Sequence, residues 1–150
     1  MSFPESKPDH LSGIEYLRQV VNGELPLPPM CETLPMRFTH VGDGLVRLIA
    51  TAGPGHANTL GGIHGGFAAT VIDTVTGCAV HTAMQPGESY TTISLELKML
   101  RPTPMGEPIF AEGRLINVSR RLGIAEGLLR NGEGKLIAQG SATCMVFRAD

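Results

Sequence analysis

The strongest constraint on the fold is one long apolar helix that begins at a cluster of glycines. The stretch GGIHGGFAATVIDTV, residues 61–75, has four glycines among its first six residues. Apolar side chains then recur at steps of three and four residues, which predicts a helix from Gly65 to just before Gln85-Pro86-Gly87. This helix carries a single acid, Asp73, among apolar and small residues. A carboxylate in such surroundings costs free energy unless something compensates for it, so Asp73 needs an explanation.

The segments on either side of the helix have the period-two pattern of strands. Two predicted strands, 35–41 and 45–51, flank the turn Gly42-Asp43-Gly44. From Tyr90 to Met99, apolar residues alternate with polar ones, which predicts one long strand with a single apolar face. Three further strand-like runs are 109–118, 124–130 and 136–147. Hairpin connections favour an antiparallel sheet with the helix on one side, so the predicted fold class is α+β.

The N-terminal region has a different character. Ser12 and Glu15 fit a capping box at the start of a short amphipathic helix, which Gly23 ends. The sequence ELPLPPM, residues 24–30, then has three prolines and predicts an extended connector. We therefore divide the chain into an N-terminal helix with a Pro-rich connector, residues 1–32, and one domain, residues 33–150.

Composition excludes several classes of function. With 42% hydrophobic residues the chain can bury a core, and a net charge of −2 gives no basic footprint for nucleic acid. No run reaches the roughly 18 apolar residues of a membrane span, and the first ten residues do not resemble a signal peptide. Cys31, Cys78 and Cys144 are odd in number and far apart, which suits a reducing compartment. We expect a soluble cytoplasmic protein.

Common catalytic motifs are absent from the sequence. There is no GxSxG, no GxxxxGK[ST] and no GxGxxG after a strand. His56 and His64 are eight residues apart in a loop, and we interpret them as ordinary loop histidines. Cys78 falls on the apolar side of the helix and is interpreted as a small core residue. We therefore expect neither a metal nor a cofactor.

The helix start is the positive signal. The first N–H groups of a helix have no internal partner and carry partial positive charge, and Gly65 and Gly66 would let a ligand oxygen approach them closely. A carbonyl oxygen that becomes an oxyanion would be stabilised there. Asp73 lies about 12 Å further along the helix, too far to reach the same carbonyl. A site that uses both would need Asp73 of a neighbouring subunit.

These residues match a known family. The pattern is Asn58, His64-Gly65-Gly66 and Asp73, then Tyr90-Thr91-Thr92 and Leu100-Arg101-Pro102. It resembles the hotdog-fold acyl-CoA thioesterases, in particular the phenylacetate-pathway and 4-hydroxybenzoyl-CoA thioesterase type, over about residues 33–147. The resemblance implies an antiparallel sheet wrapped around one central helix, two chains paired edge to edge, and pairs that usually form homotetramers. Active sites would lie at the dimer interface.

The resemblance also implies catalytic roles. Gly65 would donate its N–H to the thioester carbonyl, and Asn58 would help to hold that carbonyl or the attacking water. Asp73 would be either the general base or the nucleophile. Thr92 would position the water, and the predicted alternation favours it over its neighbour Thr91. His64 would shape the turn before the helix.

The same resemblance implies a set of substrate contacts and leaves questions open. CoA is part of the substrate. The residues expected to contact the substrate are Gly66, Thr91, Arg101, Arg120 and Arg121. The three arginines would meet the CoA phosphates. Two other functions are a non-catalytic acyl-CoA sensor and a hydratase or dehydratase, although His81 stands eight residues after Asp73 and makes no convincing pair with it. Aryl and medium-chain acyl groups both remain possible.

Overall fold

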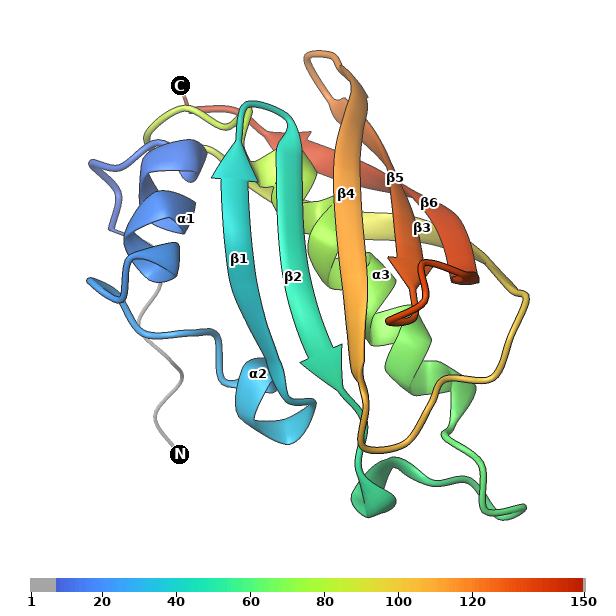
Figure 1. The fold of residues 1–150 in the computed structure, drawn as a ribbon. Coiled ribbons are helices and arrows are strands. Elements are labelled where there is room, and N and C mark those ends of the chain that lie inside the picture. The colour runs from blue at the N-terminus through green and yellow to red at the C-terminus, as the bar shows by residue number, and fades with distance from the viewer. Residues whose placement is uncertain (1–7, 150) are drawn as a thin grey trace.

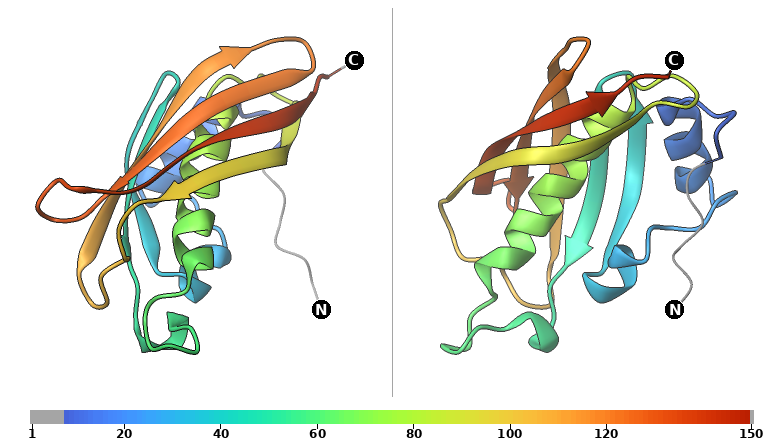
Figure 2. Two further views of the ribbon diagram at one scale, coloured as in Figure 1. Left: turned by 90° about the vertical axis from the view of Figure 1, so that its right-hand side faces the viewer. Right: turned by 180° about the vertical axis from the view of Figure 1, so that it is seen from behind.

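The computed structural model describes residues 8–149 and contains one antiparallel sheet that curves around a long helix, α3 (Gly65–His81) (Figures 1 and 2). The strands are β1 (Met36–Gly42), β2 (Leu45–Thr51), β3 (Ser89–Met99), β4 (Pro108–Val118), β5 (Leu122–Arg130) and β6 (Leu136–Phe147). Their order across the sheet is β1-β2-β4-β5-β6-β3, so β1 and β3 form its two edges. The predicted α+β hotdog fold is confirmed.

A row of glycines lets the sheet approach the helix closely. Gly113, Gly127 and Gly140 are cross-strand partners on β4, β5 and β6. A Cβ at Gly113 would collide with the backbone carbonyl of Val75, and one at Gly140 would lie 3.2 Å from Ile72. The three glycines therefore leave room for the middle of α3 to cross the sheet.

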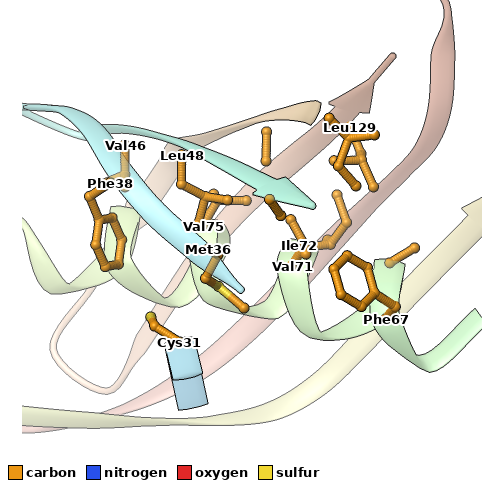
Figure 3. Packing of buried hydrophobic residues seen from close by; sticks show 14 of the residues in the cluster. Cys31, Met36, Phe38, Val46, Leu48, Phe67, Val71, Ile72, Val75 and Leu129 are labelled. Carbon is orange, nitrogen blue, oxygen red and sulfur yellow. The ribbon is translucent and has the colours of Figure 1, made fainter. Parts of the chain in front are cut away.

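The core lies between this sheet and α3. Phe67, Val71, Ile72 and Val75 project from the helix and are at most 2% exposed. They meet side chains of β2 and β5, including Val46, Leu48 and Leu129 (Figure 3). Since burial of each large apolar side chain contributes about 1.5–3 kcal/mol, this contact fixes the position of the helix.

The N-terminal region packs on the same core. Helix α1 (Gly13–Val21) begins with the predicted capping box of Ser12 and Glu15, and buries Leu17 and Val20 in the core cluster. The connector ends in a short helix, α2 (Met30–Thr33), which the sequence did not predict. Its N-cap is Pro29, and the fixed φ of proline is compatible with a helix start. Residues 1–7 of the predicted N-terminal region, and Asp150, lie outside the described residues.

The single apolar face predicted for 90–99 is wrong in one respect. The pairing of β3 with β6 shifts between Thr92 and Ser94, which leaves Ile93 unpaired in a bulge. A bulge inserts one residue and so reverses the alternation. Thr92, Leu95 and Leu97 are half-buried, whereas Thr91 and Ile93 are exposed. Thr91 therefore does not share the face of Leu95.

Candidate active site

The start of α3 presents one unoccupied backbone donor. His64 is the N-cap residue, and its Nδ1 accepts a hydrogen bond from the Gly66 N–H at 2.8 Å. The Phe67 N–H donates to the His64 carbonyl at 2.9 Å. Within residues 8–149 the Gly65 N–H has no hydrogen-bond partner. The cap thus occupies the N–H of Gly66 and leaves that of Gly65 available to a ligand.

A cleft of about 330 Å³ opens beside Gly65. A Cβ at Gly65 would lie 2.9 Å from the Met99 sulfur, so glycine allows the end of β3 to pack against the helix start. The exposed Arg101 donates one N–H to the Leu136 carbonyl at 2.8 Å. The residues that line the cleft are Ile63, Gly65, Ala68, Met99, Leu100, Arg101, Pro102, Thr103 and Ile137.

Asn58 lies in the loop that leads to α3. Its side-chain oxygen accepts the N–H groups of Leu60 at 2.9 Å and Gly62 at 3.2 Å, which fixes the orientation of the amide. No hydrogen bond among the described residues involves the amide nitrogen of Asn58. Asn58 can therefore donate to a carbonyl oxygen, whereas its own oxygen is already used.

Asp73 lies further along α3, under the edge strand β3. Its Oδ1 is buried and has no hydrogen-bond partner within the described part of the chain. Burial raises the pKa of the Cys144 thiol, and the charge of Asp73 raises it further. Burial also raises the pKa of Cys78 to about 12, so this thiol stays protonated near neutral pH and is no nucleophile. With Cys78 held as the thiol, Asp73 is the candidate base of this group.

Thr92 joins this group from the facing strand. Its hydroxyl lies 3.7 Å from the Cys144 sulfur, on the side of the sheet that faces α3. The neighbouring Thr91 points to the exposed side. The contact with Cys144 was not foreseen, because the bulge that pairs Thr92 with Cys144 leaves no signal in the alternation pattern.

The structure separates some of the predicted site residues. Arg120 and Arg121 are exposed and follow β4. They lie near the C-terminal end of α3, because a Cβ at the nearby Gly123 would contact Val80 of that helix. They therefore lie at the opposite end of the helix from Gly65 and Arg101. Asp73 is eight residues from Gly65 along the helix, about 12 Å by helical rise.

Residues 8–149 contain no group of three or more His, Cys, Asp or Glu residues that could hold a metal ion. The ring nitrogens of His56 contact the backbone of Gly53 and Thr33, each at 2.9 Å.

Within residues 8–149, no helix is long and apolar enough to cross a membrane.

Comparisons with known proteins give the family and the fold of this chain. Residues 60–138 match the family model described as the thioesterase superfamily. A phenylacetic acid degradation-related protein of Ralstonia eutropha superposes with a TM-score of 0.79 at 30% identity, over 87% of this chain and 98% of that one. Zebra fish thioesterase superfamily member 2 shares the fold, with a TM-score of 0.73 at 24% identity over 88% and 96% of the two chains.

Among curated proteins, mouse acyl-coenzyme A thioesterase 13 is 32% identical over 89 residues, which are 59% of this chain. The match spans 63% of the length of that relative, a little less than two thirds. The match to the family model covers more than half of the chain and contains both Gly65 and Asp73. The chain belongs to the thioesterase superfamily and has its hotdog fold.

Proposed function

We propose that this protein hydrolyses acyl-CoA thioesters to a free acid and CoA. One observation carries the proposal: among residues 8–149, a single helix has an N–H without a partner at its start, on Gly65, and a buried carboxylate oxygen without a partner, on Asp73. The first group can stabilise a developing oxyanion, and the second can accept a proton. Membership of the thioesterase superfamily supports the assignment.

The thioester carbonyl would be polarised at the start of α3. Its oxygen would accept the N–H of Gly65, where the helix dipole favours negative charge. The free amide N–H of Asn58 would supply a second donor. Removal of one such donor from an oxyanion hole typically costs about 10²–10³-fold in rate.

Asp73 would drive the attack on the polarised carbon. As a general base it would take a proton from a water held by the Thr92 hydroxyl, while the water oxygen bonds to the carbonyl carbon. The carbon–sulfur bond then breaks, and the CoA thiolate leaves and takes up a proton. In the alternative course the Asp73 carboxylate attacks the carbonyl carbon, the carbon–sulfur bond breaks and the CoA thiolate leaves and takes up a proton. Water then hydrolyses the resulting mixed anhydride to the free acid and restores Asp73.

Each complete site would need two chains. Gly65 packs against Met99 at the end of β3, whereas Asp73 lies among residues near the start of that strand, such as Tyr90. The outer edge of β3 has no neighbour in the sheet of one chain. If two β3 edges pair antiparallel, the Met99 end of one strand lies beside the Tyr90 end of the other. A homodimer would then bring Gly65 of one chain towards Asp73 of the other, and dimers would associate into a homotetramer.

The cleft also suggests how the substrate would be held. Its lining beside Gly65 is largely apolar, which suits an acyl group or the pantetheine arm of CoA. Arg101, at the same cleft, would meet a CoA phosphate. Arg120 and Arg121 lie at the other end of α3, so they would act on a substrate bound mainly by the partner chain. We propose a cytoplasmic location, where acyl-CoA is available, and no cofactor besides the substrate.

Two other functions have less support. A hydratase or dehydratase would need a histidine opposite Asp73, but the ring of His81 packs between those of Tyr16 and Tyr90, with centroids 5.6 and 5.2 Å away. A non-catalytic acyl-CoA sensor needs no base, yet Asp73 has a buried oxygen to which no described residue hydrogen-bonds.

The test is a panel of short-chain, medium-chain and aryl acyl-CoAs. Release of free thiol should be followed together with loss of the thioester absorbance, because the protein has three free cysteines. We expect kcat/KM of at least about 10⁴ M⁻¹s⁻¹ for the best substrate. Binding by calorimetry without turnover of any member would support the sensor instead.

A further inference from the structure

His56 makes contacts that a surface loop residue does not need. It ends the turn η1 (Pro54–His56), and its Nδ1 accepts the Gly53 N–H at 2.9 Å. Its Nε2 lies 2.9 Å from the carbonyl oxygen of Thr33, the last residue of α2. Since a carbonyl only accepts, Nε2 carries the proton, and one tautomer is fixed. Both nitrogens are thus occupied, and neither is left for a metal or for acid–base chemistry.

The same residue also contacts the start of α3. Its ring packs on Phe67, with centroids 4.9 Å apart. Phe67 is 2% exposed. It lies in the core beside Val71 and Ile72 (Figure 3). Its carbonyl oxygen accepts the N–H of His64, the N-cap residue, at 2.8 Å. His56 therefore connects α2 to both the cap and the first turn of α3.

From these contacts we infer that His56 is a positioning residue for the Gly65 N–H. Gly65 directly follows His64, whose N–H donates to the His56 carbonyl. It lies in the same first turn as Phe67, on which the His56 ring packs. A glycine pair at a helix start has little stiffness of its own, so neighbouring contacts must set the direction of the free N–H. The Nε2 bond to Thr33 extends this support to α2, the short helix that follows the Pro-rich connector, and gives α2 the role of a brace. The inference rests on the proposed function of Gly65.

Two substitutions separate the two ring bonds. In His56→Asn the amide oxygen can replace Nδ1 and keep the bond to Gly53, but nothing reaches Thr33. In His56→Gln the amide nitrogen can replace Nε2 and keep the bond to Thr33. If the brace sets the site, kcat should fall about tenfold in His56→Asn with KM unchanged, because small displacements of reacting groups are costly. His56→Gln should stay within about threefold of wild type.

A second measurement does not depend on turnover. In ¹⁵N-labelled protein, the order parameter of the Gly65 amide should fall in His56→Asn and stay near the wild-type value in His56→Gln. His40→Asn is the matched control, because His40 lies on β1 beside Gly42 and belongs to no part of this network. It should leave both kcat and the Gly65 amide unchanged.

The outcomes distinguish this inference from the proposed function. Absence of turnover in the wild-type protein would remove the proposed function, while the amide data would still test the brace. If His56→Asn and His56→Gln both keep the wild-type order parameter at Gly65, the inference is wrong, whatever their activity. Equal loss of order in both variants would overturn the brace role of α2, because the bond to Thr33 would then have no separate effect.

Discussion

The two ends of α3 differ in how their backbone groups are used. At the C-terminal end, the Thr82 hydroxyl donates to the Ala79 carbonyl at 2.7 Å and accepts the Gly44 N–H at 2.9 Å. The Met84 carbonyl accepts the N–H of Gly13 from α1 at 2.9 Å. At the N-terminal end, by contrast, the Gly65 N–H has no partner in the described residues and faces a cleft.

This difference separates stability from function within one helix. The end covered by α1 is packed so closely that a Cβ at Gly13 would collide with the carbonyl of His81. The other end has its own cap, the loop with His56 and Met99 of β3 beside it, and within the described residues it still leaves one N–H without a partner. Changes at the C-terminal, closed end of α3 should therefore lower stability. Changes at the N-terminal, open end of α3 and at Asp73 should lower turnover.

The largest effect is expected at Asp73. Asp73→Asn keeps the shape but removes the base, so kcat should fall about 10²–10⁴-fold with little change in KM. The thermal midpoint should not fall, because no residue in the described part of the chain makes a hydrogen bond to the buried Oδ1 that could be lost. Asp43→Asn, in the exposed β1–β2 turn, is the matched control and should retain full activity. A folded Asp73→Asn variant with near wild-type kcat would refute the catalytic role.

The next effect concerns the open end itself. Gly65 is the first helical residue, where proline fits and lacks only the N–H. Gly65→Pro should lower kcat about 10²–10³-fold. Gly65→Ala places a similar Cβ against the flexible end of Met99 but keeps the N–H, so it controls for bulk. Steady-state kinetics that show equal losses in the two variants would mean that crowding, and not the donor, matters.

The sequence predicted the open end better than the closed one. The glycines before α3, the isolated Asp73 and the family pattern were visible as local features. The closed end depends on residues far apart in the chain, such as Gly13 and Met84, and nothing in either segment indicates that they meet. The sequence likewise does not predict the bulge at Ile93, because the bulge depends on how β3 pairs with β6.

At the closed end, Gly13→Ala should act on stability alone. The added Cβ would collide with the His81 carbonyl, and overpacking of this kind typically costs about 1–3 kcal/mol. Denaturant unfolding should show this loss, while kcat of the folded protein stays unchanged. Gly132→Ala is the control, since nothing lies within 4 Å of a Cβ there. A lower kcat in folded Gly13→Ala would contradict the division between the two ends.

The smallest effect is expected away from both ends, at Glu112 on the sheet. Burial alone would raise the pKa of this carboxyl, but hydrogen bonds from Arg47 at 2.6 Å and Arg114 at 2.8 Å outweigh it and lower the pKa. A lowered folded-state pKa stabilises the fold above the unfolded value, and this contribution is lost as pH falls through the folded value. Glu112→Gln should therefore lower the free energy of unfolding at pH 7 by at most about 1 kcal/mol. Urea unfolding should be measured at pH 7 and below about pH 4, and the difference between variant and wild type should shrink at the lower pH. A difference that stays constant would contradict the ion-pair explanation.

The central claim is that one helix serves two sites, and subunit complementation tests it most directly. Gly65→Pro and Asp73→Asn chains should each be nearly inactive alone. If Gly65 of one chain works with Asp73 of the other, a mixed dimer contains one intact site. Equimolar co-refolding of the two variants should then restore about a quarter of wild-type kcat per chain, since half of the dimers are mixed. A mixture no more active than the average of its two parents, although mixed dimers are shown by mass spectrometry, would contradict the account.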